Sequence, residues 1–139
     1  MNHFVMDAFH GYRSRLDDMM LIYEALEEIP QKLGMKAVMP PFILPYYNGV
    51  IPEDCGISAF VFLVGGHFTI HTFSFRETYF VDLLSPEAFD TIKAEKLIKE
   101  AFRKKKSRIA TKPSAGSKEK RIEHKKQKSQ IKQSRRRPR

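Results

Sequence analysis

The clearest candidates for chemistry in this sequence are two histidines four residues apart, His67 and His71. They lie in a run of β-branched and aromatic residues, which is typical of a strand. Residues four apart on a strand are separated by about 13 Å, because each residue adds roughly 3.3 Å. His67 and His71 therefore cannot bind one metal ion together, and we expect neither a metal site nor another cofactor here.

The histidines follow Gly65 and Gly66, and this glycine pair has two interpretations. Gly-Gly between two apolar, β-rich segments is a strong hairpin signal, because glycine tolerates the positive φ angles of tight turns. The second interpretation is a catalytic position that has lost its nucleophile. Both interpretations put the glycines between two strands, and they differ only on whether a site lies beside the turn.

A longer stretch of the sequence supports the second interpretation. After an apolar strand at 60–64, the chain reads Gly65-Gly66-His67-Phe68-Thr69-Ile70-His71-Thr72. This stretch resembles the processing site of the bacterial and archaeal S-adenosylmethionine decarboxylases, where a strand is followed by Glu-Ser-His and a Thr-Ile-His-Thr-like sequence. Gly56-Ile57-Ser58 is similar to the Gly-Val-Ser of the same family. The resemblance extends over residues 3–102.

This resemblance implies a reaction that begins with a self-cleaving serine, and that serine is missing here. In the family, a serine attacks its own preceding peptide bond, and elimination leaves a pyruvoyl group that acts as electron sink for decarboxylation. Gly66 takes that position in this chain, so it offers neither a nucleophile nor a leaving group. The resemblance also implies that Ser58 and His71 support processing as a hydrogen-bonded pair on neighbouring strands. They would be catalytic only if the chain is active.

Two further positions depart from the family pattern. Pro86 stands about where the family has its proton-donating cysteine, and Phe75 stands where it has a substrate-binding carboxylate. The resemblance therefore implies the family's fold and its pairing into oligomers, without its decarboxylase activity. Phe42, Tyr47 and Phe73 are candidates to stack an adenine-like ring.

The charge of the chain is divided unevenly. Residues 1–102 hold 8 Lys and Arg against 14 Asp and Glu, a net of −6, whereas residues 103–139 hold 17 against 2, a net of +15. The second segment has no Phe, Tyr or Trp and little to bury, which predicts a disordered basic tail. Such a tail is suited to a nucleic acid or another polyanion. A solubilising or membrane-surface role, or docking on the acidic domain, are the alternatives.

A single cysteine, Cys55, excludes an internal disulfide, and its acidic neighbours Glu53 and Asp54 make it a poor nucleophile. The sequence contains no signal-like segment and no apolar run near 18 residues. We therefore expect a cytoplasmic protein without a membrane span.

Periodicity predicts an α+β two-layer sandwich for residues 1–102, with an antiparallel sheet of four to five strands and two helices on one face. The strands are expected at 4–8, 42–47, 57–64, 67–75 and 78–84. One helix is expected at 14–34, starting at Ser14 and closed by Gly34, and the other from Ser85-Pro86-Glu87 to Phe102.

Three functions remain open from the sequence. The first is a ligand-binding or regulatory relative of the decarboxylases, which binds S-adenosylmethionine or a related metabolite, or tunes a homologue. The second is a dimeric interaction module that binds nucleic acid through residues 103–139. The third is an enzyme that acts on S-adenosylmethionine by a pyruvoyl-independent route, with His71 and Ser58 as its working residues.

Overall fold

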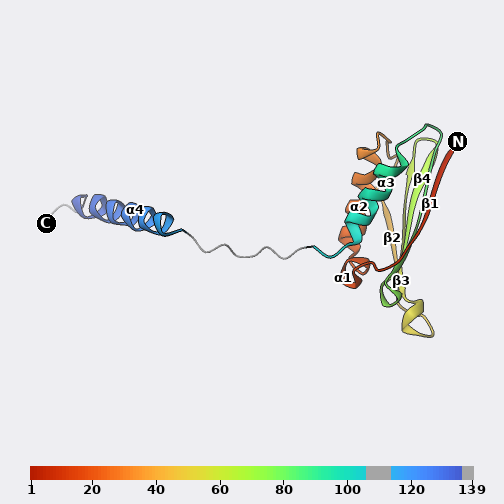
Figure 1. Cartoon of the computed structure of the whole chain (residues 1–139), viewed down its shortest axis with the longest axis horizontal. Coiled ribbons are helices and arrows are strands. Elements are labelled where there is room, and N and C mark those ends of the chain that lie inside the picture. Colours follow the sequence, from red (N-terminus) through yellow and green to blue (C-terminus); the bar gives the residue numbers. More distant parts are fainter. Residues whose placement is uncertain (106–113, 136–139) are drawn as a thin grey trace. The chain divides into compact units, whose positions relative to one another are not determined.

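The computed structural model describes residues 1–105 and 114–135. The chain divides into two units, Met1–Lys105 and Lys106–Arg139. The first unit is an α+β two-layer sandwich, in which two longer helices cover one face of a five-stranded antiparallel sheet (Figure 1). This architecture confirms the fold class expected from the sequence.

The five strands agree closely with those expected from the sequence. Their bounds are β1 Asn2–Ala8, β2 Phe42–Tyr46, β3 Gly56–Leu63, β4 Gly66–Phe73 and β5 Thr78–Ser85. All neighbours pair antiparallel, in the order β1-β5-β4-β3-β2. Gly65 has a φ of 76° between β3 and β4, which confirms the hairpin turn at the glycine pair.

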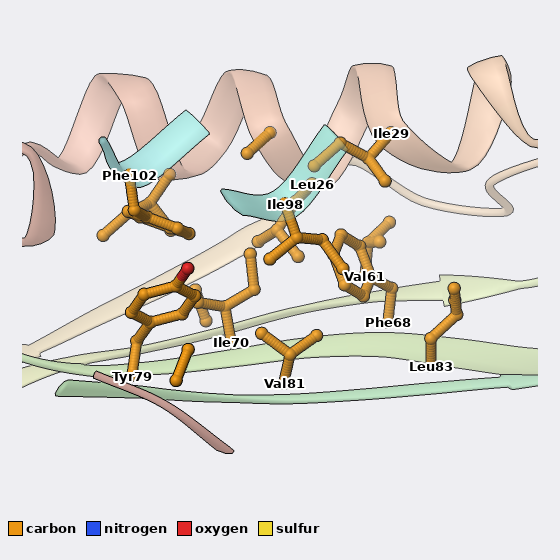
Figure 2. Packing of buried hydrophobic residues seen from close by; sticks show 14 of the residues in the cluster. Leu26, Ile29, Val61, Phe68, Ile70, Tyr79, Val81, Leu83, Ile98 and Phe102 are labelled. Carbon is orange, nitrogen blue, oxygen red and sulfur yellow. The ribbon is translucent and has the colours of Figure 1, made fainter. Parts of the chain in front are cut away.

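Aliphatic and aromatic side chains fill the layer between the sheet and the helices (Figure 2). Phe68 and Ile70 of β4 are fully buried there, against residues of both helices such as Leu26 and Ile98. The buried Thr72 continues this face of β4, and its hydroxyl donates a hydrogen bond to the Leu16 carbonyl at 2.7 Å. The alternation predicted for this strand is therefore confirmed.

The single helix expected at 14–34 is wrong, because two helices occupy the segment. They are α1, Arg13–Leu16, and α2, Met19–Lys32. The carbonyl of Leu16 accepts a hydrogen bond from the Thr72 hydroxyl, and Asp18, whose backbone is extended, starts α2 by accepting the Leu21 N–H at 3.1 Å. These two side-chain contacts explain why the chain breaks at this point.

The end of α2 agrees with the expectation that Gly34 closes it. Gly34 has a φ of 81°, and the Met35 N–H donates to the Pro30 carbonyl at 2.9 Å. This pattern is the Schellman motif, in which a left-handed residue satisfies the last helical carbonyls.

The second long helix, α3 (Thr91–Phe102), begins later than the sequence pattern indicated. A start at Ser85-Pro86-Glu87 is wrong, because Ser85 still belongs to β5 and its hydroxyl instead accepts the Glu87 N–H in a turn. Asp90 is the true N-cap and accepts the Lys93 N–H at 2.9 Å. The helix ends at Phe102 as expected, with that ring 4.5 Å from the ring of Tyr79.

The second unit contains a helix where a disordered tail was expected. Residues Ala115–Ser134 form α4, whose side chains are all exposed. The expectation is corrected for this range, because Lys, Gln and Glu are good helix formers that need no core, and Ser114 caps the helix by accepting the Ser117 N–H. The parts of the tail at 106–113 and 136–139 lie outside the described residues.

None of the helices that the structure describes is both long and apolar enough to cross a membrane.

Candidate functional site

Helices α2 and α3 lie on the same side of the sheet, so within residues 1–105 the opposite side, here called the open face, has no helix on it (Figure 1). Strand pairing arranges its side chains in rows that cross the strands. The first row holds His3, Leu84, His67 and Phe62, the second Val5, Asp82, Thr69, Phe60 and Phe42, and the third Asp7, Phe80, His71, Ser58 and Leu44. The rows collect polar and aromatic groups that are far apart in the sequence.

The expected pairing of Ser58 with His71 is present on this face. The two residues lie directly opposite each other on β3 and β4, and Ser58 Oγ is 2.9 Å from His71 Nδ1. The hydroxyl can donate to the imidazole or accept from it, depending on which ring nitrogen carries the proton. A hydroxyl beside an exposed imidazole is a pair that can pass a proton.

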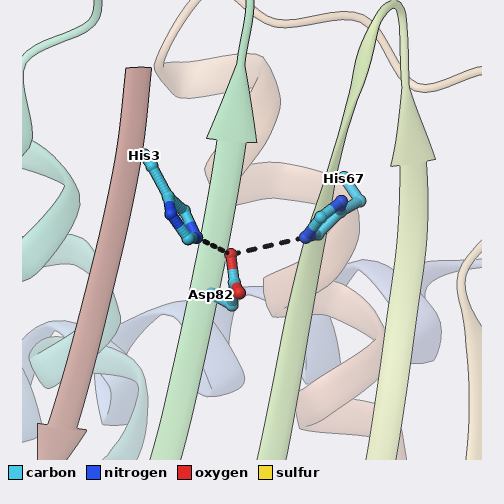
Figure 3. A network of polar contacts seen from close by, with 3 residues as sticks. All are labelled: His3, His67 and Asp82. Carbon is cyan, nitrogen blue, oxygen red and sulfur yellow. Dashed lines mark hydrogen bonds and ion pairs between the residues drawn. The ribbon is translucent and has the colours of Figure 1, made fainter. Parts of the chain in front are cut away.

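A second polar cluster was missed by the sequence analysis. The Nε2 atoms of His3 and His67 approach the same carboxylate oxygen of Asp82 from opposite sides, at 2.8 Å and 3.3 Å (Figure 3). All three side chains are between about one-third and one-half exposed, so the cluster is accessible to a ligand. Within the described ranges, no group of three or more His, Cys, Asp or Glu is arranged to hold a metal ion.

An apolar groove runs beside these clusters. Its volume is about 290 Å³, and it is lined by Phe42, Leu44, Ser58, Ala59, Phe60, Phe62, His67, Thr69 and His71. The rings of Phe42 and Phe60 are 5.4 Å apart, and those of Phe60 and Phe62 are 5.1 Å apart. Aromatic walls with a few polar groups at one side are typical of small-molecule sites.

Of the three aromatic residues expected to bind a ligand, only Phe42 lines the groove. The ring of Phe73 packs edge-on against Phe80, with centroids 5.7 Å apart. The hydroxyl of Tyr47 donates to Asp17 at 3.1 Å. Burial and this hydrogen bond raise the pKa of the Tyr47 phenol. The groove instead uses Phe60 and Phe62, which the sequence analysis had assigned only to a strand.

Gly66, at the start of β4, is tightly enclosed. A Cβ built on it would lie 1.9 Å from the carbonyl oxygen of Leu84 on β5, far inside a van der Waals contact. Pro86 lies beside the same turn, because a Cβ on Gly65 would be 3.0 Å from its Cγ. The two positions at which the resemblance marks lost catalytic groups, 66 and 86, are therefore close together.

The Ser58–His71 pair is remote from this turn within one copy of the chain. His71 is five residues along β4 from Gly66, which corresponds to about 16 Å. A separate cavity of about 300 Å³ adjoins the turn, with Leu63, Val64, Ser85 and Pro86 in its wall. A single copy of the chain therefore has two separate cavities, the groove beside Ser58–His71 and the cavity beside Gly65–Gly66.

Comparison with known proteins identifies the family. The chain is similar to the crystal structure of the adenosylmethionine decarboxylase from Aquifex aeolicus VF5, with a TM-score of 0.59 and 16% identity, over 79% of this chain and 95% of that one. No curated protein matches the sequence. The sequence model of the S-adenosylmethionine decarboxylase family matches residues 2–113, which is most of the chain. The chain therefore belongs to the S-adenosylmethionine decarboxylase family.

Proposed function

We propose that this chain is a family member that forms no pyruvoyl group and does not decarboxylate, and that it binds S-adenosylmethionine or a related metabolite in the open-face groove. The observation that carries the proposal is the combination of an aromatic groove with an enclosed Gly66. The groove offers a surface suited to binding, whereas Gly66, which the resemblance places at the self-cleaving serine, has no nucleophile.

The surroundings of Gly66 support the loss of processing. Glycine lacks the hydroxyl that attacks the preceding carbonyl, and the Leu84 carbonyl oxygen fills the space that a serine side chain would need. Pro86, which has no ionisable group, stands about where the resemblance places the proton donor. Three parts of the reaction are therefore missing together: the nucleophile, the room for it and the proton source.

The chemistry of the groove supports a nucleoside-sulfonium ligand. Phenylalanine rings stack on an adenine, and their faces attract a cationic centre such as a sulfonium. Phe42 and Phe60 offer such rings, and His67 and His71 stand at the groove with ring nitrogens that bind polar ligand atoms. This chemistry agrees with the family's substrate and does not require a pyruvoyl group.

We also propose that a second copy of this chain covers part of the open face. Val5 is 61% exposed, Leu44 55% and Phe62 50%, and they all lie on this one side of the sheet. Exposed apolar side chains gathered on one side of a sheet are a mark of protein interfaces. Leu44 and Phe62 also line the groove, so the second copy would lie against the bound ligand. An active homologue with the same surface is the alternative partner, which a tuning role would require.

The test of binding is calorimetry of the full chain with S-adenosylmethionine, followed by chromatography of the mixture. We expect saturable heat without product in the wild type, and at least about a tenfold weaker affinity in Phe60→Ala, whose ring contacts both other phenylalanines of the groove. Phe80→Ala is the matched control, because this ring lies on the open face outside the groove. No heat in the wild type would overturn the binding proposal.

The same mixture tests the pyruvoyl-independent route. Product formation that is lost in both Ser58→Ala and His71→Ala would favour an enzyme whose working pair is the observed hydrogen bond. The mass of the denatured protein tests processing separately: we expect one species of 16.2 kDa. Two fragments that meet near residue 66 would contradict the proposal that no pyruvoyl group forms.

A second candidate function, binding of a nucleic acid by residues 103–139, is favoured by the arrangement of charge on α4.

A further inference from the structure

Helix α4 carries its positive charge mainly on one face. Six basic residues stand at intervals of three and four along it, and we call them the basic stripe. They are Lys118, Arg121, Lys125, Lys128, Lys132 and Arg135. Residues three and four apart lie on the same side of an α-helix, and Arg135 keeps helical backbone angles at the C-cap. The stripe therefore extends for about 26 Å, at 1.5 Å per residue, over nearly the whole helix.

The acidic residues of α4 do not neutralise this stripe. Neither Glu119 nor Glu123 is three or four residues from any member of it. The two lysines outside the stripe, Lys120 and Lys126, are each three residues from Glu123. Glu123 thus stands beside the lysines outside the stripe, and neither acid interrupts the row of stripe cations.

A row of like charges weakens the helix that carries it. Successive members of the stripe are three or four residues apart, and like-charged pairs at these spacings repel. The exposed side chains of α4 provide no burial that offsets this repulsion. A ligand with regularly spaced negative charges would remove the repulsion and stabilise the helix when it binds.

We propose that α4 binds double-stranded DNA through the basic stripe, without sequence preference. The B-form major groove is about 12 Å wide and admits an α-helix, and a straight row of cations can follow phosphates along its edge. Residues 103–139 contain no Phe, Tyr or Trp, so they have no ring on which the bases of a single strand would stack. The major groove of double-stranded RNA is deep and narrow, so it offers no comparable seat for a helix. This inference does not depend on the proposed metabolite site, which belongs to the first unit.

The test uses a variant in which two lysines of the stripe move to other faces of α4 while the net charge of the chain stays the same. Exchanging Gln127 with Lys128 and Lys132 with Gln133 gives the substitutions Q127K, K128Q, K132Q and Q133K. This permuted full chain keeps the composition and net charge of the wild type, but two of the six stripe cations leave the stripe. Affinity for a labelled 20-base-pair duplex is measured by fluorescence anisotropy over a range of salt concentrations.

We expect the permuted chain to bind about tenfold or more weakly at 0.1 M salt, and the slope of log affinity against log salt to be smaller by about 2, because each phosphate contact contributes about 0.9. Equal affinities and equal slopes for the two chains would overturn the proposal, because net charge alone would then explain binding. Binding of a single strand, of duplex RNA or of anionic lipid vesicles as tightly as of duplex DNA would also overturn it.

Circular dichroism supplies a second readout. The helical signal of the wild-type chain should rise when duplex DNA is added, because phosphates screen the stripe, and it should rise less in the permuted chain. No rise in the wild type would contradict the coupling of helix and binding. Calorimetry with S-adenosylmethionine should give the same result for both chains, so that failure of this proposal is distinguished from failure of the metabolite site.

Discussion

The two faces of the sheet use alternate residues of the same strands for different purposes. On β4, Phe68, Ile70 and Thr72 point into the helical layer and are almost completely buried. Their immediate neighbours His67 and His71 point to the open face, where they meet Asp82 and Ser58. One strand therefore supplies side chains to both the core and the candidate site. Substitutions on the covered face should lower stability, whereas substitutions on the open face should weaken binding.

The largest contrast should come from two phenylalanines. Phe68→Ala on the covered face removes a fully buried ring and should lower the free energy of unfolding by about 3–5 kcal/mol. Phe80→Ala on the open face, where the ring is 37% exposed and packs edge-on against Phe73, should cost about 1 kcal/mol or less. Urea unfolding measures both. Equal losses would mean that the open face is buried in solution, and the Phe80→Ala loss should then depend on protein concentration.

The next effect concerns the turn at Gly66. Gly66→Ser should lower the free energy of unfolding by about 3 kcal/mol, because the new Cβ must displace the Leu84 carbonyl or the β4–β5 pairing. We also expect no self-cleavage. Thermal unfolding and the mass of the denatured protein measure the two results. A stable variant that splits in two would show that the backbone here adapts easily, and that only the hydroxyl was missing.

A smaller contrast is available from two threonines on the same strand. Thr72→Val leaves the Leu16 carbonyl without its hydroxyl donor in a buried position and should cost about 2 kcal/mol. Thr69→Val, three residues earlier on the open face, should change stability by about 0.5 kcal/mol or less. Urea unfolding of the two variants measures both losses of free energy. If the two variants lose the same free energy, Thr72 does not hold the break between α1 and α2.

The last effect is confined to high pH. Burial in the covered layer raises the pKa of Tyr79 from 10.0 to about 12. The unfolded phenol therefore releases its proton first, and stability should fall as the pH rises from about 10 to about 12, by at most about 1.4 kcal/mol for each pH unit. Tyr79→Phe should remove this part of the pH dependence. Parallel curves for wild type and variant would contradict the burial of the hydroxyl.

Strand alternation made much of this comparison predictable from the sequence. The pattern from His67 to Thr72 correctly separated the two faces, and the glycine pair correctly marked the hairpin. The Ser58–His71 pair was expected only through a family resemblance. The residues themselves carry no signal of their pairing, because thirteen positions separate them and a turn sets their register.

The remaining features depend on contacts that no local pattern contains. The cluster of His3, Asp82 and His67 exists because β5 lies between β1 and β4, and 79 positions separate His3 from Asp82. The break before α2 required knowledge that Thr72 binds the Leu16 carbonyl. The tail was interpreted from its lack of a core, whereas α4 forms through helix propensity and capping, which require no burial.

The close approach of Leu84 to Gly66 limits which substitutions this turn can accept. Any side chain introduced at position 66, serine included, meets the Leu84 carbonyl, so the change costs stability unless β5 shifts. Position 66 is therefore coupled to β5: a side chain is accepted there only together with a second change that moves the Leu84 carbonyl.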